Sequence, residues 1–133
     1  MDTNLAITLT LFLQLGLLLL AVAASPVERA VSMLSDGLTA FSAAVIAYAL
    51  IGFGLQFGGL GVIASVKGAS ELLREWSPLD TAWGPGWGVI GLAGFNVFGD
   101  FPADLLPFFL FHALLAATSA MLAALAIANR ARP

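Results

Sequence analysis

The sequence contains no cysteine, a single histidine and few charged residues. The missing cysteines exclude a disulfide framework, a thiolate metal site and a cysteine nucleophile. The lone histidine, His112, excludes a metal site built from several histidines of one chain. Only five residues are basic and the formal net charge is −3, so the chain lacks the basic surface that nucleic-acid binding requires.

The chain is rich in apolar residues and poor in charged ones. Hydrophobic residues make up 60% of the 133 positions and charged residues 10%, whereas an ordinary soluble domain is about 25% charged. A chain this apolar could not cover a water-facing surface, which excludes a soluble globular enzyme. The same composition excludes intrinsic disorder, which needs low hydrophobicity and high charge. The sequence therefore predicts a single integral membrane domain over residues 1–133.

The spacing of the charges delimits the membrane spans. A helix that crosses a bilayer needs about 20 apolar residues, and three uncharged stretches are long and regular enough. We predict an all-α protein with three transmembrane helices, at about 4–24, 36–57 and 104–129. Residues 25–35 are expected to form a loop. Asp104 is expected to cap the third helix, with Pro107 in its first turn.

Residues 58–103 are predicted to form a long external loop rich in glycine and tryptophan. Six glycines and a proline within 81–99 disfavour a helix, because each glycine costs about 1 kcal/mol and each proline about 3. We expect an irregular or re-entrant segment there, and a short amphipathic surface helix over 62–76. The three tryptophans of the chain are the expected interfacial anchors: Trp76, Trp83 and Trp87.

The basic residues predict an orientation. With three spans, Arg29, Arg130 and Arg132 share one side of the membrane, and Lys67 and Arg74 lie on the other. Cytoplasmic segments carry the excess of basic residues. We therefore expect a protein integral to the cytoplasmic (inner) membrane, with its N-terminus outside and its C-terminus inside.

Several motifs, taken in order, resemble the ammonium transporter/methylammonium permease/Rh family. The run AFSAAVIAYALIGFGLQFGG at 40–59 resembles the second transmembrane helix of that family, including its aromatic, glycine-rich ending. Leu13–Gly16 lies at the spacing of the first helix, and Gly88–Gly91 resembles an external segment of the family. Phe109–Arg130 resembles the third helix. The resemblance covers nearly the whole chain.

The resemblance implies a truncated and diverged version of the N-terminal three helices of such a transporter. Members of the family have many more helices, built as two inverted halves, and work as trimers. Phe111 matches one phenylalanine of the gate over the pore, and Leu115 stands where the other is expected. His112 replaces the usual glutamine. In a transporter, these three residues would belong to the substrate path.

Small residues and one ionisable side chain are the other candidate functional features of the spans. The small residues predict close helix packing against other membrane-protein subunits or a second copy of the chain, within the lipid bilayer. They are Ala116, Ala120 and Ala124 on the third helix, and Gly54 and Gly58 on the second. Four polar residues are candidates for interhelical hydrogen bonds: Gln14, Tyr48, Gln56 and Thr118.

His112 has three open interpretations. It is a candidate for a proton or ammonia relay, for an axial ligand to a pigment or haem, or for a hydrogen bond to a neighbouring helix. No carboxylate lies at its depth to complete a catalytic triad, so no enzyme is predicted. No cofactor and no other metal ligand is predicted, and a bound lipid or pigment stays an open alternative.

Three functional hypotheses follow. Three helices cannot enclose a pore alone, which favours a non-catalytic structural or accessory subunit of a larger membrane complex, photosynthetic or respiratory, on an ammonium-transporter-like scaffold. The alternative is transport of ammonium or ammonia as part of an oligomeric or split channel. A further alternative is pigment or haem ligation through His112.

Overall fold

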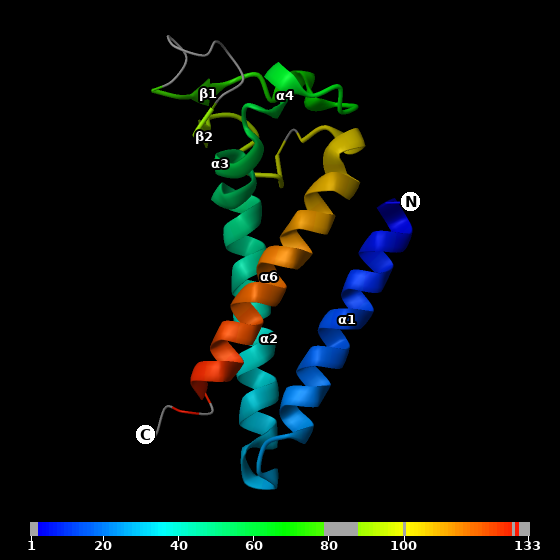
Figure 1. Ribbon diagram of the computed structural model, residues 1–133, viewed down its shortest axis with the longest axis vertical. Coiled ribbons are helices and arrows are strands. Elements are labelled where there is room, and N and C mark those ends of the chain that lie inside the picture. Colours follow the sequence, from blue (N-terminus) through cyan, green and yellow to red (C-terminus); the bar gives the residue numbers. More distant parts are fainter. Residues whose placement is uncertain (1–2, 79–87, 100, 129, 131–133) are drawn as a thin grey trace. The chain divides into compact units, whose positions relative to one another are not determined.

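The computed structural model describes residues 3–78, 88–99, 101–128 and 130 (Figure 1). It is mostly helical, and three helical stretches are long and apolar enough to cross a membrane. They are Asn4–Ala23, Val27–Ile63 and Ala103–Ala128. This confirms the predicted fold class of a helical membrane protein with three spans. The chain divides into two compact units, Met1–Ile46 with Leu110–Pro133, and Ala47–Phe109.

The first unit consists of α1 (Thr3–Ala23), the 3₁₀ turn η1 (Val27–Arg29), α2 (Ala30–Ala47) up to Ile46, and α6 (Leu106–Ala128) from Leu110 onward. Figure 1 shows α1 and α2 side by side and antiparallel. Its core is a cluster of four buried side chains, Leu18, Met33, Met121 and Leu125. Gly37 keeps α2 free of a side chain where Leu18 and Leu125 pack against it.

The second helix begins earlier than predicted. Residues 27–35 are helical rather than a loop, because Pro26 has φ of −57° and starts the new helix immediately after α1. The Ser25 hydroxyl donates to the Val22 carbonyl and closes the last turn before it. The charges at Glu28 and Arg29 therefore do not end a helix. They lie on an exposed turn that starts one.

The second unit combines short helices with a small two-stranded ladder. A π-helical segment η2 (Tyr48–Gly52) continues α2 and leads into α3 (Phe53–Phe57) and α4 (Leu60–Ile63). The 3₁₀ turns η3 (Ala69–Glu71) and η4 (Ala103–Leu105) flank the strands β1 (Glu75–Trp76) and β2 (Ile90–Gly91). The strands pair antiparallel, with Glu75 opposite Gly91 and Trp76 opposite Ile90.

Two local predictions in this unit are wrong. Residues 62–76 do not form one amphipathic helix, because Gly68 adopts a left-handed φ of +83° and the Gly61 amide bonds to the Leu72 carbonyl. Asp104 does not cap the third helix, because its carboxylate accepts a hydrogen bond from Lys67 Nζ at 3.0 Å. The irregular character predicted for 81–99 is confirmed over 88–99, where the chain is irregular apart from β2.

Candidate functional site

A cluster of aromatic rings forms the centre of the second unit. Phe53 is fully buried, and the centroids of five other rings lie 5.4–6.3 Å from its own. Most of these contacts are edge-to-face, which aromatic pairs prefer because of their quadrupoles. The five partners are Tyr48, Phe57, Phe101, Phe108 and Phe109.

Tyr48 brings a polar group to the edge of this cluster. Its ring stacks on Phe109, with centroids 5.9 Å apart and planes at 27°. Its hydroxyl donates a hydrogen bond to Gln56 Oε1 at 2.8 Å. The two residues lie eight positions apart, and the bond ties η2 to the last turn of α3. The aromatic cluster thus keeps its single hydroxyl satisfied.

The segment 91–97, which we call the strap, lies against η2 and α3. The Asn96 amide donates to the Leu50 carbonyl at 3.1 Å, and the Val97 amide donates to the Ala49 carbonyl at 3.0 Å. A π-helical turn shifts the backbone bonding from i→i+4 to i→i+5, and such turns occur frequently at functional sites. Here the shifted carbonyls serve as acceptors for the strap.

Gly54 and Gly58 provide the surface on which the strap lies. A Cβ on Gly54 would lie 2.7 Å from the Phe95 ring, and one on Gly58 would lie 2.6 Å from the amide nitrogens of Leu92 and Ala93. Both glycines are buried. The spacing of these two glycines predicted that another helix packs closely against them. Within this unit, the segment in close contact with them is the strap, which is a loop.

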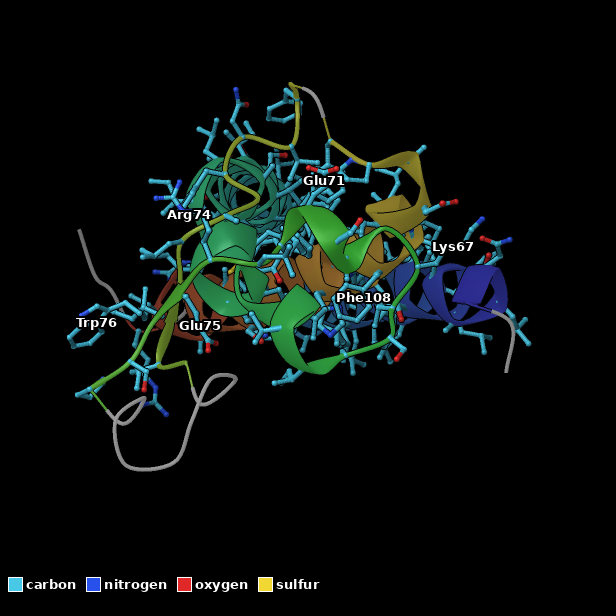
Figure 2. All side chains as sticks on the ribbon, turned by 90° about the horizontal axis from the view of Figure 1, so that it is seen from above. Lys67, Glu71, Arg74, Glu75, Trp76 and Phe108 are labelled. Carbon is cyan, nitrogen blue, oxygen red and sulfur yellow. The ribbon has the colours of Figure 1, made fainter. Side chains whose placement is uncertain are left out.

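A cavity of about 250 Å³ lies beside the strap in the same unit. Its polar side chains are Gln56 and Glu75, and the carboxylate of Glu75 packs against Gly59 and Gly88. The remaining lining is apolar or glycine: Phe57, Leu60, Ile63, Val89 and Gly91. Figure 2 shows Trp76, which follows Glu75, projecting from the outer edge of this unit, and its side chain is 53% exposed. Trp83 and Trp87 lie outside the described residues.

The three predicted path residues lie on α6 in the first unit. Phe111 and His112 are half-buried, with ring centroids 5.4 Å apart and planes at 88°. Leu115 is 43% exposed and lies one helical turn after Phe111, on the same face. Among the described residues no group of three or more histidine, cysteine, aspartate or glutamate side chains could hold a metal ion.

The buried row of α6 consists of Ala113, Ala117, Met121 and Leu125. The alanines predicted to pack, Ala116, Ala120 and Ala124, lie beside this row and are half-buried. The helix face that carries these alanines is therefore only partly covered within the unit. Its contact with another subunit stays a prediction.

A polar contact joins α1 to α6. Gln14 Nε2 donates to the Leu114 carbonyl and to Thr118 Oγ1, both at 2.7 Å, and the Thr118 hydroxyl donates to the same carbonyl. Gln14 is 5% exposed. The predicted role of Gln14 and Thr118 in interhelical hydrogen bonding is confirmed.

The comparison with known protein families is decisive for the identity of the chain. The family described as the Ammonium Transporter Family matches residues 3–132. The chain belongs to the ammonium transporter family. No curated protein and no solved structure matches it. Members of this family are transporters and not enzymes, in agreement with the absence of a predicted catalytic group.

The assignment of Phe111, His112 and Leu115 to a substrate path comes from the resemblance and stays a prediction. Sequence reasoning did not identify Glu75 or Asn96 as structurally important. The spacing of Gly54 and Gly58 predicts that another segment packs closely against α3. No local sequence pattern identifies that segment as the strap, which lies about 40 residues further along the chain.

Proposed function

We propose that this chain supplies part of a membrane path for ammonium or ammonia, which further helices complete. The observation that carries the proposal is the family match over nearly the whole chain. The three spans support it, because only 22–28% of the residues in their apolar windows are buried. Most residues of the spans therefore keep some surface open to lipid or to additional helices, whether from more of the same polypeptide, another copy or another subunit.

We assign Phe111, His112 and Leu115 to the path. The apolar side chains of Phe111 and Leu115 would form a constriction that disfavours a bare cation, because removing an ion from water is costly. A neutral imidazole has one ring nitrogen that accepts a proton, so the His112 side chain is suited to take a proton from ammonium before the neutral molecule proceeds. The two functions together would favour ammonia over metal cations of similar size.

Uptake of labelled methylammonium into proteoliposomes tests this proposal. We expect saturable uptake by the full protein and at least a tenfold loss in His112→Ala. Leu110→Ala is the matched control, since Leu110 lies on the same helix and is 39% exposed, but helical geometry turns it away from His112 and Leu115. Absence of uptake at every protein density would contradict the proposal.

The accessory-subunit hypothesis is the competing proposal, and the half-exposed alanines of α6 are the observation in its favour. The family match adds no support to it. Co-purification of stoichiometric bioenergetic subunits from native membranes, together with no uptake, would favour it over transport. Pigment or haem ligation through His112 is tested by the visible absorption spectrum of the purified protein.

A further inference from the structure

The second unit contains a cavity that the proposed transport does not use. It has a volume of about 250 Å³ and receives residues from α3, α4 and both strands. We call it the Glu75 cavity, because Glu75 contributes the one charged side chain of its described lining. The apolar side chains of that lining are Phe57, Leu60, Ile63 and Val89.

Two glycines make room for the Glu75 carboxylate at the wall of this cavity. A Cβ on Gly59 would lie 2.6 Å from Glu75 Oε2, and a Cβ on Gly88 would meet the same oxygen. A side chain at either position would therefore displace the carboxylate. Glu75 is half-buried, and successive side chains of a strand point to opposite faces, so Arg74 and Trp76 are directed away from the cavity.

The cavity has an acidic lining. Its described residues include no lysine, arginine or histidine, and the sequence has no lysine or arginine between Arg74 and Arg130. A concave surface that carries charge of one sign attracts ligands of the opposite sign. A carboxylate also offers about four acceptor positions, so Glu75 can receive the N–H groups of a ligand in addition to bonds within the protein. The cavity therefore favours a cation.

The polar groups of the cavity suit an ammonium group better than a metal ion. Calcium and magnesium ions take about six or more oxygen ligands. The described lining offers one carboxylate, and the oxygen of Gln56, its other polar side chain, already accepts the Tyr48 hydroxyl. An ammonium group needs fewer acceptors, and the ring of Phe57 in the same lining can stabilise its charge through a cation–π contact.

The size and the apolar walls of the cavity select a cation with an apolar body. An apolar cavity of about 150 Å³ is large enough to bind benzene. The Glu75 cavity, at about 250 Å³, therefore has room for an ammonium group together with a chain of about six carbon atoms. Ile63 and Val89 are 65% and 60% exposed, so such a chain would cover apolar surface that the unit itself leaves open.

We propose that the Glu75 cavity binds primary organic ammonium ions that carry an apolar chain of about six carbon atoms. The Glu75 carboxylate accepts hydrogen bonds from the ammonium group, and the Phe57 ring stabilises its charge. Leu60, Ile63 and Val89 contact the chain. This site does not depend on the proposed transport, because its lining shares no residue with the proposed path.

Calorimetric titration of the full chain in lipid nanodiscs with n-hexylammonium chloride tests the role of Glu75, with empty nanodiscs as the background. We expect saturable binding to the wild type and at least tenfold weaker binding to Glu75→Gln. Glu71→Gln is the matched control, because Glu71 is exposed, is not among the lining residues and lies apart from Glu75 in Figure 2. Equal losses in the two variants, or no binding to the wild type, overturn the proposal.

A ligand series on the wild type tests the apolar part of the site without relying on the folding of any variant. From ethylammonium to hexylammonium, each added methylene group should tighten binding by about twofold to fourfold, as its burial predicts. 1-Hexanol has the same chain without the charge, and it should bind at least tenfold more weakly than hexylammonium. Equal affinity for ethylammonium and hexylammonium, or for 1-hexanol and hexylammonium, overturns the proposal. Both measurements record binding and not uptake, so their outcome is separate from that of the transport assay.

Discussion

Gln14 illustrates how a single polar side chain acts in a span with no charge nearby. Both of its amide hydrogens are used on α6, at Leu114 and Thr118, so it fixes the rotation of α1 against that helix. In lipid, helices gain little from burying apolar surface, because acyl chains are as apolar as leucine. Packing and a few hydrogen bonds therefore decide which faces meet.

Replacing Gln14 with leucine should lower the free energy of unfolding by about 0.6–2 kcal/mol, the usual value of an interhelical hydrogen bond in a membrane. The loss stays limited because the Leu114 carbonyl still accepts the Thr118 hydroxyl. Unfolding by titration with a denaturing detergent measures it. Thr118→Ser is the matched control, since it keeps the hydroxyl and should change stability by much less. Equal stability of Gln14→Leu and the wild type would contradict this prediction.

Phe53 carries the largest packing contribution in the second unit, because its ring contacts five others and is fully buried. Phe53→Ala should destabilise the protein by about 3–5 kcal/mol, as expected when a buried aromatic ring is removed. Phe98→Ala is the control, because Phe98 is 71% exposed and surface substitutions usually stay within about 0.5 kcal/mol. Thermal or detergent unfolding of the two variants should differ clearly, and similar values would refute the central role of Phe53.

At the scale of elements, the helices could be predicted from the sequence and the strap could not. Charges are excluded from the bilayer core, so their spacing locates the spans with no knowledge of tertiary structure. Two carbonyls of the π-helical turn η2 accept hydrogen bonds from the amides of Asn96 and Val97, more than 40 positions away. Nothing local in the sequence from Tyr48 to Gly52 indicates that pairing. The same limit applies to Asp104. Its local sequence predicts a helix cap, but in the structure its carboxylate accepts a hydrogen bond from Lys67, which is distant in sequence.

Gly58→Ala should detach the strap from α3. A Cβ there meets backbone nitrogens of the strap at 2.6 Å, and backbone cannot rotate away as a side chain can. We expect hydrogen exchange at the Asn96 and Val97 amides to accelerate at least tenfold, since both lose their carbonyl partners on η2.

Gly16→Ala is the control for that substitution. Nothing lies within 4 Å of a Cβ at Gly16, and alanine is favoured over glycine in a helix by up to about 1 kcal/mol. Gly16→Ala should therefore leave the exchange of the strap amides unchanged and keep or raise stability. Slow exchange of both amides in Gly58→Ala would show that the strap tolerates a side chain at this position.

For the whole molecule, the distribution of basic residues leads to a prediction about orientation. With three spans, the segment that contains Arg29 is predicted to share one side with the C-terminal Arg130 and Arg132, opposite the loop that contains Lys67 and Arg74. The positive-inside rule counts lysines and arginines near the ends of spans, and it favours a cytoplasmic location for Arg29 and Arg130.

Labelling of single cysteines in intact cells checks this orientation. Ser70→Cys, in the exposed part of the loop, should react with a membrane-impermeant maleimide added outside. Val27→Cys, at an 86% exposed position near Arg29, should react only after the membrane is permeabilised, because the predicted orientation puts its turn in the cytoplasm. The reverse pattern would place the N-terminus inside, and Phe111, which we propose for the path, would then lie toward the cytoplasmic side. Because the difference of basic residues between the sides is small, adding two lysines beside Ser70 should be enough to weaken or invert the labelling pattern.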